Sequence, residues 1–405
     1  MQNRNMSLEI KSRFPIFRAH PDLVYLDNAA TTQKPDTVIE RITEFYKEGN
    51  ANIHRGVYPL AAQATTDFEA SRDKVQQFIN AAKREEVLFN SGTTAGTNLV
   101  AQSFALHRLQ RGDNIVISAM EHHANLIPWQ VICQKTGAEL RVIPMNSKGE
   151  LDQKAYSTLL SNKTCLVAVA HISNTLGTIN PVEEMVSMAK QKGIPVLLDV
   201  AQSIAHYPID VQALECDFLV FSGHKLFGPT GIGVLYGKEE WLAQMDPYQY
   251  GGDMIRDVTF SETTFAGLPN KFEAGTPNIA GAIGLGEAVD FLVSIDRAQI
   301  LQNLKELQAY AMSSLLSIEG LQLIGRATNR TAIFSFALAD IHPHDIATFL
   351  GEEKIATRAG HHCTQPIMDF FGLPATTRAS FSIYNTTADV DRLVQTLRDI
   401  KAFFS

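Results

Sequence analysis

Two ionisable side chains stand at or just after the ends of apolar segments, and the ammonium of the lysine has no ordinary structural use there. Lys225 follows Phe218-Leu-Val-Phe221 closely, and Asp199 ends Pro195-Val-Leu-Leu-Asp199. Both segments predict buried strands, and ligands of open α/β sheets gather beyond the carboxyl ends of the strands. A helix cap is the alternative for Asp199. A Schiff-base lysine and an aspartate for a pyridinium nitrogen are the two groups that pyridoxal phosphate chemistry requires.

A possible phosphate site lies in Asn90-Ser-Gly-Thr-Thr94, between a predicted strand and a predicted helix. Free backbone N–H groups, the helix dipole and the hydroxyls of Thr93 and Thr94 would converge there on one anion. A capped helix start without a ligand is the alternative, because Ser and Thr caps are common. The presence of Lys225 and Asp199 elsewhere in the chain favours the phosphate site.

Two further side chains could contact a flat heteroaromatic ring. His122, in Glu121-His-His-Ala-Asn125, follows a predicted strand, and its imidazole could stack on the ring and handle protons. A structural histidine that caps a helix is the alternative. The adjacent histidines point apart and lack a nearby third ligand, so no metal site is predicted. Gln202, three residues after Asp199, could donate its amide to the phenolic oxygen of the ring.

A thiol and a guanidinium near the C-terminus could act on a substrate. Cys363 lies in the short polar loop Arg358-Ala-Gly-His-His-Cys363, where positive neighbours favour the nucleophilic thiolate. Arg378 enters an apolar, strand-like run and suits bidentate capture of a substrate carboxylate, with a surface ion pair as the alternative. The other cysteines are expected to be buried and inert; they are Cys133, Cys165 and Cys216.

Strand-like and helical segments alternate through the first two thirds of the chain. Strands are predicted near residues 86–89, 114–117, 140–143, 166–169, 196–198, 218–221 and 232–236. This alternation predicts a mostly parallel sheet between helices, in a large domain over residues 21–290. One long helix is predicted from 283 to about 316, then a strand over 331–336 and a terminal helix over 388–404. Residues 1–20 and 291–405 are predicted to form a smaller α/β domain that carries the cysteine loop.

Composition and charge exclude several classes of function. The 405 residues have a formal charge of −8 and no polybasic cluster, which argues against a nucleic-acid partner. No apolar run approaches the length of a membrane span, and the polar start lacks the apolar core of a secretory signal. The four cysteines have no paired spacing, which suits a reducing compartment. We therefore expect a cytoplasmic enzyme that acts on small molecules.

Taken together, the segments resemble the SUF-type (group II) cysteine desulfurases, also called selenocysteine lyase-like. These are class V aminotransferases among the fold-type I pyridoxal phosphate enzymes, and the resemblance covers nearly the whole chain. It departs from the family pattern at Ala95, Val200 and Tyr250. Its motifs are Tyr25-Leu-Asp-Asn-Ala-Ala30, His54-Arg-Gly56, Gly92-Thr-Thr94, Glu121-His-His-Ala-Asn125, Pro128-Trp129, Asp199 with Gln202, Ser222 to Gly233, Phe272 to Asn278, and Arg358 to Cys363.

The resemblance implies a role for each candidate residue. Lys225 would carry the cofactor, with Asp199 and Gln202 holding its ring and His122 stacked on it as a catalytic residue. The groups implied to bind the phosphate are Thr93, Thr94, Ser222 and His224, while Thr276 would reach the phosphate of the neighbouring subunit in a homodimer. The groups implied to bind the substrate are Asn174, Arg358, Arg378 and His54. Cys363 would be the sulfur acceptor.

The implied activity is a cysteine desulfurase. It would convert L-cysteine to L-alanine and a persulfide on Cys363, and pass the sulfur to an acceptor protein of the SufE or SufU type for iron–sulfur cluster assembly. Selenocysteine lyase or another class V activity is the alternative, and Cys363 argues against transamination, which needs no protein thiol. A non-catalytic sulfur carrier or assembly scaffold is a third interpretation, which Lys225 and its ring partners disfavour.

Overall fold

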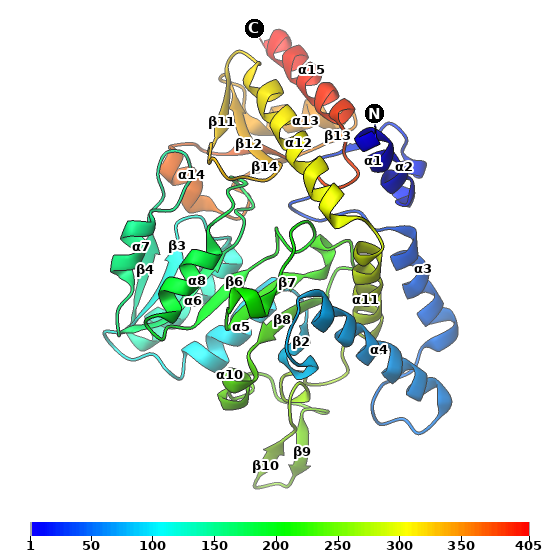
Figure 1. The fold of residues 1–405 in the computed structure, drawn as a ribbon, viewed down its shortest axis with the longest axis vertical. Coiled ribbons are helices and arrows are strands. Elements are labelled where there is room, and N and C mark those ends of the chain that lie inside the picture. The colour runs from blue at the N-terminus through cyan, green and yellow to red at the C-terminus, as the bar shows by residue number, and fades with distance from the viewer. Residues whose placement is uncertain (1, 405) are drawn as a thin grey trace.

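A seven-stranded sheet forms the centre of the computed structural model, which describes residues 2–404 (Figure 1). Only β8 runs opposite to its neighbours, so the sheet is mostly parallel and the predicted fold class is confirmed. All seven predicted strand segments are strands of this sheet. In spatial order they are β2 (Val87–Asn90), β8 (Gly233–Gly237), β7 (Phe218–Ser222), β6 (Val196–Asp199), β5 (Thr164–Ala170), β3 (Asn114–Ser118) and β4 (Glu139–Ile143).

Alternate side chains of the central strands enter two different apolar cores. In β7, Leu219 and Phe221 pack in one core, and Phe218 and Val220 pack in the other. Because both faces are buried, the strands read as continuous apolar runs rather than as alternating ones. The first core includes residues of α4 (Pro59–Phe78), α8 (Val182–Lys190) and α11 (Ile279–Val293), and the second includes residues of α5 (Thr93–Val100), α6 (Ile127–Thr136) and α10 (Glu239–Gln244).

A second, antiparallel sheet lies next to one end of the first (Figure 1). Its strands are, in order, β11 (Leu321–Ile324), β12 (Ile333–Leu338), β15 (Thr376–Ser380) and β14 (Arg358–Gly360). The first three of these strands share a third core with α12 (Arg297–Leu316), α13 (Pro343–Glu352) and α15 (Thr387–Phe404). Val24 and Leu26 also pack in this core, whereas Phe14 and Phe17 belong to the first core. The limits of the two domains stay a prediction.

The prediction of one long helix over 283–316 is wrong. The segment forms two helices, α11 and α12, which are separated at residues 294–296. Asp296 begins the second helix, because its carboxylate accepts a hydrogen bond from the backbone N–H of Gln299 at 3.0 Å. Such an aspartate cap stabilises a helix start and favours a break that apolar periodicity does not reveal.

The remaining elements are short and lie mainly around the periphery. Among residues 2–404, no helix is long and apolar enough to cross a membrane. The hairpin of β9 and β10 projects away from the large sheet (Figure 1). Apart from short 3-10 and π helices, the other elements are α1 (Gln2–Ser12), α2 (Pro15–Ala19), β1 (Val24–Tyr25), α3 (Asp36–Glu44), α7 (Gln153–Leu159), α9 (Val211–Leu214), β9 (Ile255–Val258), β10 (Thr263–Phe265), β13 (Ile355–Ala356) and α14 (Gln365–Phe371).

Candidate active site

A cavity of about 600 Å³ lies beyond the carboxyl ends of β5, β6 and β7. Parallel strands end at the same edge of a sheet, so residues far apart in the sequence meet there. All the predicted site residues line this cavity except His54 and Thr276. Those that line it are Thr93, Thr94, His122, Asn174, Asp199, Gln202, Ser222, His224, Lys225, Arg358, Cys363 and Arg378.

Asp199 and Lys225 reach the cavity from the neighbouring strands β6 and β7. Asp199 is the last residue of β6, and its Oδ1 accepts a hydrogen bond from Ala201 N at 2.9 Å. No helix follows Asp199 directly, so the alternative of a helix cap is wrong. Lys225 ends a 3-10 turn after β7. Burial raises the pKa of Asp199 and lowers the pKa of Lys225, while each charge offsets part of the shift of the other.

The N-terminal segment holds the turn that carries Lys225. The carbonyl oxygen of His224 accepts hydrogen bonds from Thr31 Oγ1 at 3.1 Å, Thr32 N at 3.0 Å and Lys34 Nζ at 3.0 Å. Thr32 Oγ1 also accepts from Phe227 N at 2.9 Å, on the far side of the turn. Burial lowers the pKa of Lys34 to about 7. The sequence does not reveal this contact, since nothing local links residues 31–34 to a turn about 190 positions away.

The predicted phosphate site lies where β2 meets α5. Thr93 N and Thr93 Oγ1 contact Ser222 Oγ at 2.8 and 2.9 Å, and Gly92 N donates to Asn90 Oδ1 at 2.7 Å. Gly92 has a φ of 140°, and a Cβ on it would approach Ser222 Oγ at 3.0 Å, so only glycine suits this position. No side chain of the N-cap residue closes the helix start, unlike the capped helix of the alternative. The first turn of the helix therefore presents N–H groups to the cavity.

His122 is held at the cavity as the cap of a short 3-10 helix. Its Nδ1 accepts a hydrogen bond from Ala124 N at 3.0 Å. His122 therefore caps a helix, as the alternative expected, and also lines the cavity. Burial, helped by the Lys225 charge, lowers the pKa of His122 to about 3, which leaves the ring neutral at pH 7. The preceding Glu121 accepts hydrogen bonds from Ala170 N at 3.0 Å and Asn125 Nδ2 at 2.6 Å. Glu121 thus ties the histidine segment to β5, a role that its local sequence does not indicate.

Cys363 is exposed and lines the cavity from a strained loop. His362 and Cys363 have φ angles of 54° and 57°, a backbone conformation that residues other than glycine rarely adopt. Contacts on both sides hold it: Asn174 Nδ2 donates to His362 O at 2.8 Å, and His123 N donates to Cys363 O at 2.8 Å. His362 Nε2 contacts Thr376 Oγ1 at 2.8 Å. The loop therefore presents the thiol in a fixed position.

The positive charge near this thiol comes from two arginines, and the neighbouring His362 does not contribute to it. Burial lowers the pKa of His362 to about 3, so this ring is neutral at pH 7. Arg358 and Arg378 both line the cavity and interact electrostatically with Cys363. The sequence-based expectation of positive neighbours holds for the guanidinium groups and is wrong for the buried His362. Cys133 and Cys216 are buried as expected, whereas the expectation is wrong for Cys165, which is only partly buried.

Asp27 bridges the two arginines predicted to bind a substrate carboxylate. Its carboxylate contacts Arg358 at 2.9 Å and Arg378 at 3.4 Å. Arg378 is buried, so a surface ion pair is excluded, and burial lowers its pKa to about 10. One of its N–H groups donates to Asn174 O at 3.0 Å, while its Nε is buried without a hydrogen-bond partner among the described residues. An unpaired buried N–H of this kind suits an anionic ligand.

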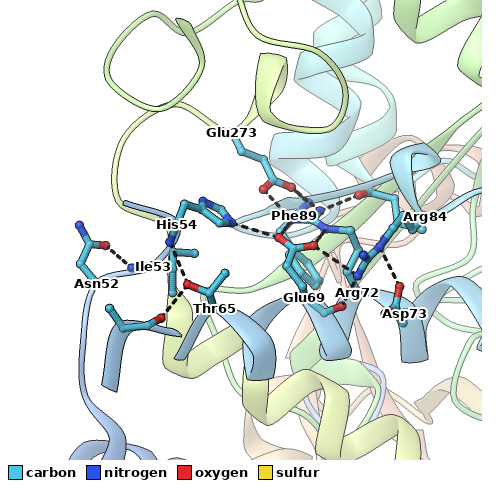
Figure 2. Close-up of polar contacts among 12 residues, drawn as sticks. Asn52, Ile53, His54, Thr65, Glu69, Arg72, Asp73, Arg84, Phe89 and Glu273 are labelled. Carbon is cyan, nitrogen blue, oxygen red and sulfur yellow. Dashed lines mark hydrogen bonds and ion pairs between the residues drawn. The ribbon is translucent and has the colours of Figure 1, made fainter. Parts of the chain in front are cut away.

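His54 and Thr276 lie outside the cavity of their own chain. Both are exposed, and His54 has a φ of 68°. The His54 ring contacts Glu69 at 3.2 Å, and its backbone N–H donates to Thr65 at 2.9 Å (Figure 2). Thr276 lies in the loop before α11. Within one chain, neither residue can contact a ligand in the cavity.

The cavity fits the cofactor that the sequence predicts. Asp199 Oδ2 is available for a protonated ring nitrogen, the start of α5 with Ser222 suits a phosphate, and the Lys225 amine lines the same cavity. Gln202 donates to Ala29 O at 2.8 Å and also lines the cavity. Burial lowers the pKa of His224 to about 4. Among residues 2–404, no cluster of three His, Cys, Asp or Glu side chains is arranged to hold a metal ion.

Comparisons with known proteins give consistent similarities over the whole chain. Residues 24–393 match the family model Aminotransferase class-V. The chain is 48% identical over 399 residues to a probable cysteine desulfurase of Halalkalibacterium halodurans, covering 98% of each protein. It is 48% identical over 396 residues to a cysteine desulfurase of Escherichia coli O1:K1 / APEC, covering 97% of each. The crystal structure of the cysteine desulfurase CsdA of Escherichia coli superposes with a TM-score of 0.92 at 39% identity and covers 98% of each chain.

Proposed function

Because the chain belongs to the aminotransferase class-V family, we propose that it is a pyridoxal phosphate-dependent L-cysteine desulfurase. One observation carries the proposal: the Cys363 thiol lines the same cavity as Lys225 and Asp199. An aminotransferase needs the lysine and the aspartate but has no use for an exposed thiol on a strained loop. The combination suits an enzyme that takes sulfur from its substrate.

The residues of the cavity would divide the binding of cofactor and substrate between them. Asp199 would hold the ring nitrogen, Gln202 the phenolic oxygen, and neutral His122 the face of the ring. Thr93, Thr94, Ser222 and His224 would bind the phosphate. When bound, pyridoxal phosphate supplies an electron sink that weakens the bonds at Cα of the substrate. The carboxylate of the substrate would meet Arg378 and Arg358, with Asn174 beside them.

Lys225 and Cys363 would carry out the chemical steps. The Lys225 amine, whose pKa burial lowers, would remove the Cα proton as a general base. The Cys363 thiolate would then attack the sulfur of the substrate, so that an S–S bond forms as the Cβ–S bond breaks. The electron pair of that bond passes to the carbon skeleton, which takes up a proton. Overall, L-cysteine and the Cys363 thiol become L-alanine and a Cys363 persulfide.

The persulfide implies partners beyond the substrate. We infer that a sulfur-acceptor protein of the SufE or SufU type removes the sulfur for iron–sulfur cluster assembly, and the exposure of Cys363 supports this. A homodimer with shared sites would explain why His54 and Thr276 lie outside their own cavity. We expect the protein to act in the cytoplasm, because a reducing compartment keeps Cys363 a free thiol.

Product analysis tests the proposed activity. Purified holoenzyme given L-cysteine should form alanine and sulfide in equal amounts with a reductant, and faster with a suitable acceptor protein. Formation of pyruvate or a keto acid instead would contradict desulfuration. Turnover of L-selenocysteine alone, with no alanine from L-cysteine, would assign the chain to the selenocysteine lyases.

Asp27 should matter for substrate affinity. In Asp27→Asn, the half-exposed Arg358 loses the ion pair that holds it beside Arg378. The pair with the half-exposed Arg358 contributes up to about 1 kcal/mol, and loss of the contact with the buried Arg378 adds to this cost. We therefore expect the KM for L-cysteine to rise by about fivefold or more with little change in kcat. Steady-state kinetics measures both. Asp22→Asn breaks an exposed pair with Lys354 outside the cavity and serves as the control. An unchanged KM in Asp27→Asn would show that Arg358 needs no such support.

Thr276 should contribute to cofactor binding if sites are shared. Removing one hydrogen bond to a charged phosphate costs on the order of 1.5–3 kcal/mol, so Thr276→Val should weaken cofactor retention by roughly ten- to a hundredfold. The absorbance of bound cofactor during dilution measures this loss. In mixed dimers of Thr276→Val with Lys225→Ala chains, both lesions fall in one pocket, and about half of the activity should survive with tight cofactor binding. Weak binding at the surviving Lys225 site would place Thr276 in its own chain's pocket.

A further inference from the structure

We propose that the buried ion pair of Arg72 and Glu273 positions Thr276 and His54 for the active site of a second copy of this chain. The inference rests on the homodimer with shared sites proposed above. It assigns a role to residues that touch neither substrate nor cofactor within one chain. Arg72 and Glu273 are thus positioning residues.

Arg72 lies at the centre of a network that holds two separate segments (Figure 2). Its side chain, on α4, is only 1% exposed. It donates to Glu273 Oε1 at 2.7 Å and Oε2 at 2.9 Å, and to Val87 O at 2.7 Å. A buried charge network of this kind often adds less stability than apolar packing would. Its use here is to fix geometry, because a bidentate pair sets the orientation as well as the distance of the two groups.

Glu273 links the exposed Thr276 segment to the strand that leads into the phosphate site. Its Oε1 also accepts a hydrogen bond from Phe89 N in β2, at 2.7 Å. Three residues after Glu273 the chain reaches the exposed Thr276, past Gly275 with a φ of 78°. The N–H of Gly275 donates to Gly252 O at 2.9 Å, which fixes the segment a second time. The threonine hydroxyl therefore stands on a short segment with a rigid base.

The other arm of the network ends at His54. Arg72 Nε donates to Glu69 Oε2 at 3.0 Å, and Glu69 Oε1 contacts His54 Nε2 at 3.2 Å (Figure 2). The left-handed backbone of His54 is costly for a residue other than glycine and persists only where its surroundings hold it. Glu69 and Thr65 provide those contacts. The two predicted site residues that miss their own cavity are thus joined through one arginine.

The surface beside these residues suits a second copy of the chain. Large apolar side chains near His54 are exposed, namely Val57 at 102%, Tyr58 at 50% and Leu60 at 49%, and Tyr250 beside the Gly252 contact is 67% exposed. Arg55 also pairs with Asp253 at 2.9 Å, which joins the two loops. In a twofold dimer each chain presents the same patch, so each would donate His54 and Thr276 to the other.

Glu273→Gln tests the positioning role, because it keeps the shape of the side chain and removes its charge. We expect cofactor retention by the homodimer to weaken by about threefold to tenfold, and by no more than in Thr276→Val. The pair would affect the cofactor only through the Thr276 hydroxyl, because His54 is predicted to bind the substrate. The double variant should therefore retain cofactor as well as Thr276→Val alone. Asp290→Asn is the control. It breaks the ion pair of Asp290 with Lys74, which lies on the same helix as Arg72, and it should leave cofactor retention unchanged. Additive losses in the double variant would overturn the proposal.

Mixed dimers decide which site the pair serves. When Glu273→Gln chains are combined with Lys225→Ala chains, the intact Lys225 site receives its Thr276 from the chain with an intact Glu273. Reactivation of that site by added pyridoxal phosphate should need no more cofactor than the wild-type dimer needs. A requirement as high as that of the Glu273→Gln homodimer would show that Glu273 acts on the phosphate site of its own chain through Phe89. That result would overturn the proposal.

Two further outcomes separate this inference from the proposed function. If Thr276→Val acts across the dimer but Glu273→Gln leaves retention unchanged, the shared site stands and the positioning role fails. If Thr276→Val acts within its own chain, the shared site itself fails. Should Glu273→Gln not fold, as judged by thermal unfolding, Arg72→Lys replaces it, because lysine keeps the charge and loses the bidentate fork.

Discussion

Replacement of Cys363 by serine should abolish sulfur release from L-cysteine. The thiol is exposed at the cavity on a loop that contacts from Asn174 and His123 hold in place. A serine hydroxyl in the same position is too weak a nucleophile to take the sulfur, so no S–S bond can form. We expect alanine formation to fall by about a thousandfold or more, the scale on which loss of a covalent nucleophile is felt. Alanine and sulfide assays measure the loss.

The same variant should keep its cofactor and its fold. The visible absorbance of the holoenzyme and its change on adding L-cysteine should remain, because Cys363 would act only after the substrate is bound. L-selenocysteine should still be consumed, since selenium can leave without a protein nucleophile. Cys165→Ser is the control, because Cys165 lies outside the cavity and burial raises its pKa to about 12. An unchanged rate with L-cysteine in Cys363→Ser would refute the persulfide role.

Replacement of Lys225 by alanine should remove both the activity and the covalent attachment of the cofactor. Lys225 supplies the amine for the Schiff base and then the general base, and loss of a positioned general base alone costs about a hundredfold to ten-thousandfold. We expect the wild-type protein to be yellow. Borohydride reduction followed by peptide mapping should place the pyridoxyl group on Lys225.

Lys34 is the residue that makes this mapping informative. Its Nζ donates to His224 O at 3.0 Å, next to Lys225, and burial lowers its pKa to about 7, so a large fraction is a free amine at neutral pH. Trypsin peptides distinguish the two lysines. A pyridoxyl group on Lys34 in the wild-type protein would contradict the site assignment, whereas its appearance only in Lys225→Ala would not.

Buried strands with a polar residue at the end were predictable from local sequence. All seven strand segments are strands of the large sheet, and Asp199 and Lys225 meet because β6 and β7 are neighbours. Buried parallel strands need continuous apolar runs, and a charged residue interrupts such a run only where it leaves the sheet. The strand, glycine and helix start predicted to bind a phosphate also lie at this edge of the sheet, and Thr93 and Thr94 line the cavity.

The break between α11 and α12 and the neutral state of His362 could not be predicted from the local sequence. Apolar periodicity continues across residues 294–296, so it could not show that Asp296 starts a new helix. A histidine in a polar loop is expected to be exposed and partly charged, yet His362 is buried against Thr376 and stays neutral at pH 7. Burial depends on what packs over a residue, and neighbouring residues in the sequence do not specify this.

By itself, the sequence determined the strand edge, the lysine, the aspartate and the thiol, because each depends on residue type and on a pattern within about ten positions. Only the tertiary structure decided which distant groups support them. Asp27 reaches Arg358 across 331 positions, and Arg72 reaches Glu273 across 201. Such pairs form when the fold brings two segments together, and their geometry is set by the packing of whole elements. The local sequence around either partner carries no mark of the other.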